Sequence, residues 1–214
     1  MIKLYNYFRS STSYRVRIAL NLKGLDYEYR PVHLRKGEQR GAAYLALNPQ
    51  GGVPALELDD GRVLTQSMAI LEYLEETRPE PPLLPEDPPA RARVRSLAFA
   101  VACDIHPLNN LRVLERLRAL GQDEAGVAAW FRHWVAVEFA ALEERLAGEP
   151  ETGRFCHGDG PTLADLCLVP QVVNGQRFDC DMAPYPTIRR IHEACMALDA
   201  FQKAHPTRQP DAEV

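Results

Sequence analysis

The sequence has few cysteines, no long apolar run and no excess of positive charge. Its cysteines are scattered and form no Cys-x-x-Cys pair; the five are Cys103, Cys156, Cys167, Cys180 and Cys195. An odd, unpaired set favours reduced thiols in a cytoplasm over disulfides or a zinc site, so no metal is expected. No apolar run reaches the length of a membrane span. Met1-Ile2-Lys3 leads directly into structured sequence, unlike a signal peptide. We therefore expect a cytoplasmic protein with no membrane partner.

A basic surface is also lacking. The net charge of −4 and the isoelectric point of about 5.9 argue against a nucleic-acid partner, which requires a basic face. Hydrophobic residues at 46% and charged residues at 25% are ordinary for a globular protein. A chain of 214 residues can bury a substantial core in one large domain or two small ones.

The first part of the chain alternates between strand and helix patterns. A helix should begin in the hydroxyl cluster Ser10–Ser13 and end near Gly24, a second should cover Glu38–Leu47, and a third should begin at Ser67. Asp59-Asp60-Gly61 is a hairpin turn, because Asp-Gly tolerates positive φ. Strands are expected at Ile2–Tyr5, Tyr27–Leu34, Val53–Leu58 and Arg62–Leu64. A βαβ unit followed by a ββα unit predicts a small α/β domain with a mixed sheet.

The hydroxyl cluster at the first helix start has two interpretations. Ser and Thr are favoured N-caps, because their oxygens accept hydrogen bonds from backbone N–H groups without intrahelical partners. The cluster is then a run of caps with no ligand. Alternatively, the helix start faces a cleft and holds an anion such as a thiolate, whose pKa a hydroxyl donor would lower.

A proline-rich segment separates this part from a helical remainder. Six prolines lie between Pro79 and Pro89 and forbid regular structure there. The predicted boundaries are an α/β domain at 1–80, a linker at 81–89 and an all-α domain at 90–214. Apolar stripes run from Val94 to Leu108 and from Val127 to Leu142, where Trp130 and Trp134 are expected to be core residues. Thr162 and Asp165 form a capping box, Pro184–Leu198 suggests a last helix, and the tail from Pro206 should be loose.

Three motifs, one of them the capping box of Thr162 and Asp165, make this arrangement resemble a glutathione transferase. Asn48–Pro54 is similar to the segment before that family's third strand, which implies a cis Pro54 and a Val53 backbone that pairs with a peptide ligand. Gln66–Ile70 is similar to the family's helix start that receives the γ-glutamyl carboxylate of glutathione. The resemblance implies a thioredoxin-like N-terminal domain (βαβαββα) followed by an all-helical C-terminal domain.

Within that family the sequence resembles the zeta class. The class motif Ser-Ser-Cys-Ser-Trp-Arg-Val-Arg-Ile-Ala-Leu matches Ser10–Leu20, and the likeness continues through Ala164–Gln171 and Ala183–Ile188. Two positions depart from it, since Thr12 replaces the cysteine and Tyr14 the tryptophan. Thr cannot form a thiolate, so either that cysteine is dispensable or the activity is lost.

The resemblance implies glutathione as cofactor and a set of site residues. The catalytic group is Ser10, Ser11 and Thr12, with Ser10 donating to the glutathione sulfur. The cofactor-binding group is Ser10, Gln39, Val53, Pro54, Gln66, Ser67, His106 and Asn110. Arg9, Arg112 and Arg177 are expected to bind the carboxylates of a small dicarboxylate substrate, because the planar guanidinium accommodates a carboxylate at two points.

The implied activity is a glutathione-dependent cis–trans isomerase that converts maleylacetoacetate to fumarylacetoacetate in tyrosine and phenylalanine catabolism. Maleylpyruvate isomerase and a general zeta-class transferase are the alternatives, and a non-catalytic binding module stays open because fold alone does not give function. The resemblance further implies a homodimer.

Overall fold

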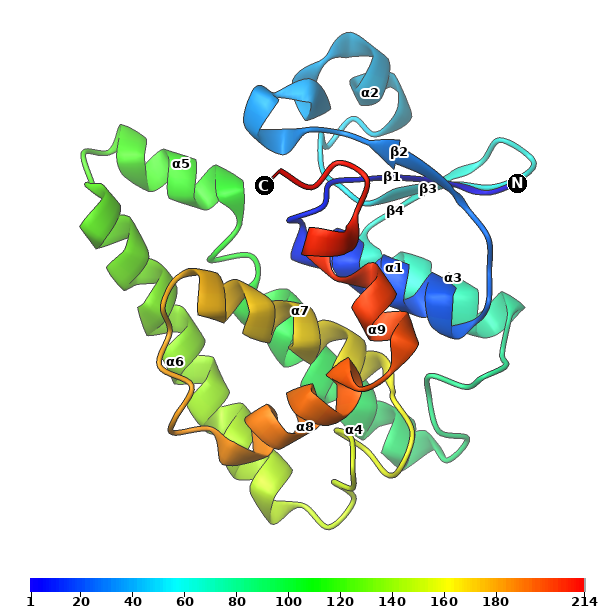
Figure 1. Cartoon of the computed structure of the whole chain (residues 1–214), viewed down its shortest axis with the longest axis vertical. Helices are drawn as coiled ribbons and strands as arrows, with labels where there is room; N and C mark the ends of the chain where they lie inside the picture. Colours follow the sequence, from blue (N-terminus) through cyan, green and yellow to red (C-terminus); the bar gives the residue numbers. More distant parts are fainter. Residues whose placement is uncertain (214) are drawn as a thin grey trace. The chain divides into compact units, whose positions relative to one another are not determined.

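A four-stranded mixed sheet forms the centre of the first part of the chain (Figure 1). Strand β1 (Lys3–Asn6) pairs in parallel with β2 (Glu28–Pro31) and antiparallel with β3 (Ala55–Glu57), which in turn pairs antiparallel with β4 (Val63–Thr65). The register places Leu4 opposite Leu56, and both side chains are fully buried. The predicted βαβ and ββα order is thereby confirmed, although β2 is shorter than predicted because a 3₁₀ turn, η1 (Leu34–Lys36), follows it.

Helices cover both faces of this sheet. Helices α1 (Ser11–Leu22) and α3 (Ser67–Thr77) lie on one face and α2 (Ala42–Leu47) on the other (Figure 1). The continuous helix predicted for residues 38–47 is wrong: a 3₁₀ turn, η2 (Glu38–Arg40), precedes α2. Two glycines cause this break, since Gly37 is left-handed at φ 78° and Gly41 is extended.

The structure describes residues 1–213, which form two compact units. Unit 1 contains Met1–Leu83 and the C-terminal residues 196–213, and unit 2 contains Leu84–Cys195. This division differs from the predicted domain at 90–214, because the chain returns to unit 1 at its end. Helix α9 (Asp199–Ala204) packs beside α1, and the 3₁₀ turn η4 (Pro206–Arg208) follows it (Figure 1).

Two buried side chains of α1 explain that return. The guanidinium of Arg17, fully buried, donates through Nε to the Ala204 carbonyl at 3.0 Å. The Tyr14 hydroxyl donates to the Phe201 carbonyl at 3.2 Å. A buried guanidinium requires acceptors, and the returning segment supplies one.

The prediction of a loose tail from Pro206 is also wrong. Asp211 accepts a hydrogen bond from the Phe8 backbone N–H at 3.1 Å and a second from the Tyr29 hydroxyl. The tail therefore braces the segment that precedes the first helix.

All the regular secondary structure of unit 2 is helical. Its helices are α4 (Pro88–Phe99), α5 (Leu111–Ala119), α6 (Glu124–Gly148), α7 (Leu163–Arg177) and α8 (Pro186–Met196), with a π-helical segment, η3 (Ala100–Ile105), after α4. The predicted linker 81–89 extends into α4, because Asp87 is the N-cap of this helix and Pro88 and Pro89 are its first two residues. Proline is tolerated there, since the first helical N–H groups have no intrahelical partner. Helix α5 was not predicted separately.

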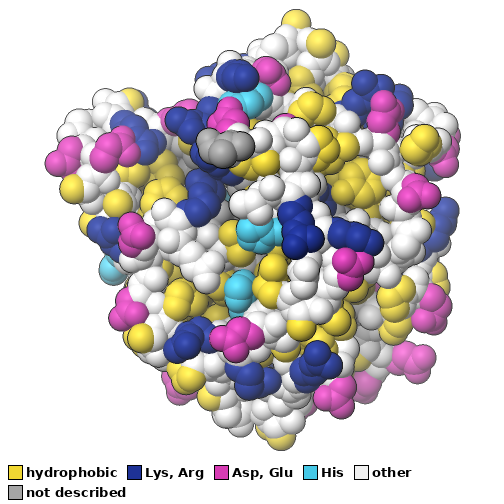
Figure 2. All heavy atoms as spheres, viewed as in Figure 1, with side chains coloured by type: hydrophobic (Ala, Val, Ile, Leu, Met, Phe, Trp, Pro, Cys, Tyr) yellow, Lys and Arg dark blue, Asp and Glu magenta, His cyan; other side chains and the backbone are white. Residues whose placement is uncertain are grey.

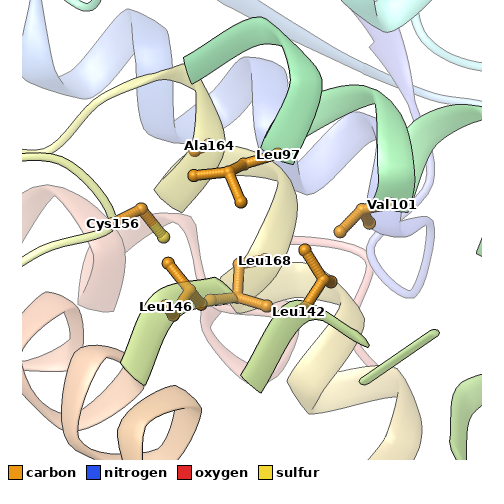
Figure 3. Close-up of a pocket in the computed structure, with 7 residues that line it drawn as sticks. All are labelled: Leu97, Val101, Leu142, Leu146, Cys156, Ala164 and Leu168. Atoms are coloured by element: carbon orange, nitrogen blue, oxygen red, sulfur yellow. The ribbon is translucent and has the colours of Figure 1, made fainter. Parts of the chain in front are cut away.

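Apolar side chains close the core of unit 2. Figure 3 shows seven of them facing one another from α4, η3, α6, α7 and the segment before α7, with too little space between them for a water molecule; they are Leu97, Val101, Leu142, Leu146, Cys156, Ala164 and Leu168. The N-terminus of α7 lies beside this core, where the buried Asp165 carboxylate accepts from the Thr162 backbone N–H at 2.8 Å. The predicted pairing of Thr162 with Asp165 is confirmed.

The surface carries charges of both signs. Figure 2 shows Lys and Arg side chains interspersed with Asp and Glu on the face in view. Among residues 1–213, no helix is both long and apolar enough to cross a bilayer.

Candidate functional site

The first turn of α1 presents hydroxyl groups at a positively polarised helix end. Ser10 is the N-cap, with extended backbone (φ −70°, ψ 117°), and its Oγ accepts from the Ser13 N–H at 3.2 Å. The first intrahelical bond runs from Tyr14 N–H to the Ser10 carbonyl at 2.9 Å. The first turn contains no acidic side chain, so no carboxylate of the helix neutralises its positive end.

Ser10, Thr12 and Val53 form a directed chain of hydrogen bonds. Thr12 Oγ1 donates to the Val53 carbonyl at 2.9 Å, and Ser10 Oγ lies 2.8 Å from Thr12 Oγ1. A carbonyl cannot donate, so the single Thr12 proton belongs to the bond with Val53. It follows that Ser10 donates to Thr12. The side chain at the position of the family cysteine therefore tethers the Ser10 hydroxyl to the segment before β3.

The segment before β3 is held in place by side-chain hydrogen bonds to its backbone. The Gly52 carbonyl accepts from the Tyr44 hydroxyl at 2.6 Å and from Asn48 Nδ2 at 2.8 Å. Burial raises the pKa of Tyr44 to about 12, which keeps its hydroxyl a donor. The Val53–Pro54 peptide is cis, as predicted. The Val53 carbonyl thus contacts the start of α1 through Thr12, and Pro54 follows it in the chain.

The start of α3 has an unusual backbone. Gln66, the residue before the helix, is left-handed at φ 69° and ψ 116°, a combination that costs a residue with a side chain about 1–3 kcal/mol. Its amide Nε2 donates to Gln50 Oε1 at 2.8 Å. Ser67 is buried at the first helical position, and the first turn of α3 again has no acidic residue. Such a helix start favours a carboxylate ligand.

Two buried side chains of unit 1 have polar atoms without a hydrogen-bond partner in residues 1–213. Gln39 is 7% exposed, and its Oε1 has no hydrogen-bond partner within residues 1–213. Arg15 is 1% exposed, and its Nη1 donates to Ser67 Oγ at 3.2 Å while Nε and Nη2 have no partner. Orphaned donors and acceptors of this kind fit a polar, anionic ligand. The sequence analysis missed Arg15; a charged residue among the apolar positions of α1 was the signal that could have indicated it.

Arg9 is half-buried directly before the Ser10 cap, with its guanidinium 4.9 Å from the centre of the Phe8 ring. Arg17 holds the segment before Arg9 by two hydrogen bonds: Nη2 donates to the Phe8 carbonyl at 3.0 Å and Nη1 to Asn6 Oδ1 at 2.9 Å. The backbone that carries Arg9 and Ser10 is therefore fixed on one side by buried charge.

The remaining predicted residues belong to unit 2, where two groups are found. Asn110 caps α5 by accepting from the Arg112 N–H at 3.2 Å, and its Nδ2 lies 3.3 Å from His106 Nε2. Arg112 is exposed on the first turn of α5. Arg177 is exposed at the last position of α7, where its Nη1 donates to Asn174 Oδ1 at 3.2 Å. His106, Asn110 and Arg112 are thus gathered at one helix start, and Arg177 lies on another helix.

No protein thiol lies in unit 1, since all five cysteines belong to residues 84–195. Burial raises the pKa of Cys156 and Cys195, and that of Cys180 to about 11. Within residues 1–213, no group of three His, Cys, Asp or Glu could hold a metal ion. At the start of α1, unit 1 itself therefore offers hydroxyl groups and no thiol.

Comparison with known proteins assigns the chain to a family. Residues 9–77 match the family model for the Glutathione S-transferase, N-terminal domain. The maleylacetoacetate isomerase of Pseudomonas aeruginosa is 52% identical over 212 residues, which covers 98% of each chain. The chain belongs to the glutathione transferase family.

Solved structures refine the assignment to the zeta class. A holo structure of maleylpyruvate isomerase, described as a bacterial zeta-class glutathione S-transferase, superposes with a TM-score of 0.96 at 55% identity and covers 99% of this chain and 100% of its own. The maleylacetoacetate isomerase of Methylobacterium extorquens AM1, solved with malonate and glutathione, has a TM-score of 0.96 at 51% identity and covers 99% of this chain and 100% of its own. As a zeta-class member, the chain has the thioredoxin-like domain that was expected, with helices after it.

Proposed function

We propose that this zeta-class protein is a glutathione-dependent cis–trans isomerase that converts maleylacetoacetate to fumarylacetoacetate. One observation carries the proposal: the hydrogen bonds from Ser10 to Thr12 and from Thr12 to the Val53 carbonyl lie at a helix start without acidic residues. Full-length relatives of this protein are isomerases of this type. The fit to glutathione is supported by the orphaned polar atoms of Gln39 and Arg15.

When bound, glutathione supplies the thiol nucleophile that allows a cis double bond to rotate, and it is regenerated. The protein must keep that sulfur ionised at neutral pH. Ser10 serves this purpose by turning its proton away from Thr12 Oγ1 toward the ligand, while the backbone amides of Ser11 and Thr12 add the field of the helix end. Thr12 can then donate to Ser10 Oγ in place of the Val53 carbonyl, so Ser10 keeps a hydrogen-bond donor of its own.

The other unit 1 residues bind the peptide part of the cofactor. Ser67 and Gln66 at the start of α3 receive the γ-glutamyl carboxylate. Val53, before the cis Pro54, pairs with the ligand backbone as an added strand would. The orphaned Gln39 amide supplies a further polar contact. His106 and Asn110 of unit 2 are proposed as additional cofactor contacts by resemblance to the family.

Arginines are proposed to bind the substrate carboxylates. Arg9 directly precedes the Ser10 cap, and Arg112 and Arg177 are exposed residues of unit 2. The malonate bound to the Methylobacterium relative supports a dicarboxylate substrate for this chain.

Two alternatives have specific support. Maleylpyruvate as substrate is favoured by the 55% identical relative, which is a maleylpyruvate isomerase. A general zeta-class transferase is compatible with the same site, since only the electrophile differs.

We further propose a cytoplasmic homodimer without nucleic-acid or membrane partners. Phe99 is 40% exposed and lines a surface groove of unit 2 with Asp104 and Arg145, which suits burial against a second copy. Sedimentation equilibrium of the purified protein measures the oligomeric state, and a monomer at micromolar concentration would contradict the dimer.

The decisive experiment measures isomerisation of maleylacetoacetate and maleylpyruvate with and without glutathione. Wild-type protein is compared with Ser10→Ala and Arg177→Ala, and Arg62→Ala, an exposed arginine of the β3–β4 turn, is the control. We expect strict glutathione dependence, impairment of the first two variants and an unchanged control. Glutathione binding without turnover of either substrate would exclude the isomerase and leave a transferase or a binding module.

A further inference from the structure

Arg15 is a buried charge with an incomplete set of partners. It lies on α1, one turn after Ser11, and only 1% of its surface is exposed. Nη1 donates to Ser67 Oγ at 3.2 Å, whereas Nε and Nη2 are buried without a hydrogen-bond partner in residues 1–213. No carboxylate in that range forms an ion pair with it. Burial of an uncompensated cation is costly, and proteins normally satisfy such a group.

Arg17, on the same helix, shows what a compensated arginine requires here. It is equally buried, yet its three nitrogens all donate: Nε to the Ala204 carbonyl, Nη1 to Asn6 Oδ1 and Nη2 to the Phe8 carbonyl. Residues two apart on a helix point in very different directions. Burial on α1 therefore does not by itself leave an arginine without acceptors. The unpartnered atoms of Arg15 are specific to its position, where it contacts Ser67 of α3.

The contact with Ser67 has a direction that matters for a ligand. A guanidinium can only donate, so Ser67 Oγ is the acceptor. The proton of the Ser67 hydroxyl is then available to a second group and cannot be satisfied by Arg15. Ser67 occupies the first helical position of α3, whose positive end favours a negative group and has no acidic side chain in its first turn.

We propose that Arg15 is a positioning residue for the carboxylate site at the start of α3. It orients Ser67 as a donor, and its unneutralised charge raises the affinity of that helix start for a carboxylate. Because the ligand would be the γ-glutamyl carboxylate of glutathione, the proposal rests on the function proposed above. Arg15 acts through Ser67 and through its field and is not assigned a contact with the reacting atoms.

The test uses two peptides that differ only in the group concerned. Glutathione and 4-aminobutanoyl-Cys-Gly, which lacks the α-carboxylate of the glutamyl residue, are titrated into the protein by calorimetry. Arg15→Met removes the charge at similar volume, Arg15→Lys keeps it without the planar fork, and Arg62→Met removes one charge from an exposed site of unit 1. Ser67→Ala tests the coupling in a double-mutant cycle.

We expect Arg15→Met to weaken glutathione about tenfold or more, the loss of one charge-assisted interaction, and to change the affinity of the decarboxylated peptide less than about twofold. Arg15→Lys should lie between wild type and Arg15→Met, and Arg62→Met should match wild type. Without ligand, Arg15→Met should be at least as heat-stable as wild type, because an uncompensated buried charge has been removed.

Several results would overturn the inference. Equal weakening of both peptides by Arg15→Met, together with a lower melting temperature, would make Arg15 a merely structural residue. An unchanged affinity for glutathione would remove its role altogether. If Arg15→Met does not fold, the same ratio of affinities measured for Arg15→Lys decides the question. A wild-type protein that binds neither peptide would instead refute the proposed function.

Discussion

Replacement of Thr12 by valine separates a hydrogen-bonding role from a nucleophilic one. Valine matches threonine in shape and deletes only the hydroxyl, which in the structure donates to the Val53 carbonyl at 2.9 Å and accepts from Ser10 at 2.8 Å. Two neutral hydrogen bonds are lost. Each contributes about 0.5–1.5 kcal/mol net, and Thr12 is only half-buried, so we expect a loss of about 1–2 kcal/mol in the free energy of unfolding.

The same change should act on the cofactor thiol. Without Thr12 as a donor, Ser10 loses the partner that supports it when it turns its proton to the sulfur, and the pKa of the bound thiol should rise. A weakening of that hydrogen bond by about 1.4 kcal/mol corresponds to about one pKa unit and about a tenfold fall in kcat/KM near neutral pH. Thr12→Ser keeps the hydroxyl and should stay within about threefold of wild type in kcat/KM.

Thiolate absorbance of bound glutathione, titrated against pH, measures the pKa, and denaturant unfolding measures the stability. Thr12→Cys restores the family residue and is the critical comparison. A rise in kcat/KM of more than about tenfold in Thr12→Cys would show that a thiol at this position contributes to catalysis beyond the hydroxyl. Wild-type activity in Thr12→Val would equally refute the role of the hydroxyl chain.

Three further perturbations test other parts of the structure. Asp165→Asn should lower the free energy of unfolding by about 3 kcal/mol. The buried carboxylate accepts hydrogen bonds from Cys156 N, Thr162 N and Thr162 Oγ1, whereas an amide has only one acceptor oxygen. Thermal unfolding measures the loss, and a loss below about 1 kcal/mol would contradict the prediction. Burial, and then the charges of Arg17 and Arg208, lower the pKa of His205 below 6.5, so unfolding takes up a proton and stability falls as the pH drops through 6.5 toward the folded-state value. His205→Asn should flatten the dependence of melting temperature on pH in that window, and an unchanged slope would exclude His205 as its source. Gln66→Gly should raise the free energy of unfolding by about 1 kcal/mol by removing the cost of φ 69°, whereas Gln66→Ala should not; equal stabilities in urea would show that this backbone is unstrained.

Local signals in the sequence predicted the elements that carry the site. The hydroxyl cluster correctly indicated a capped helix start at Ser10, and the similarity of Asn48–Pro54 to a family segment correctly indicated a cis Pro54. Thr162 and Asp165 are three residues apart, so their pairing could be read from spacing alone. Each of these features is decided within a few residues of chain.

Contacts between distant segments could not be predicted in this way. Arg17 meets its acceptor Ala204 across 187 residues, and nothing in the local pattern distinguishes a buried arginine from a solvated one. The same holds for Arg15, whose partner Ser67 lies 52 residues away, and for the tail, whose polar composition suggested disorder although Asp211 binds Phe8 and Tyr29. The charge of a side chain is visible in the sequence, but its acceptors are not.

The return of the C-terminal segment to unit 1 has a consequence for biosynthesis. Residues 84–195 are continuous, so a ribosome translates all of unit 2 before it reaches α9. Domains generally fold as units during synthesis, in order from the N-terminus. Here the strands of unit 1 are translated before unit 2, yet the acceptor for Arg17 Nε at the end of α9 is translated after it. The core of unit 1, whose sheet precedes unit 2 in the chain, can therefore be completed only after all of unit 2 has been translated.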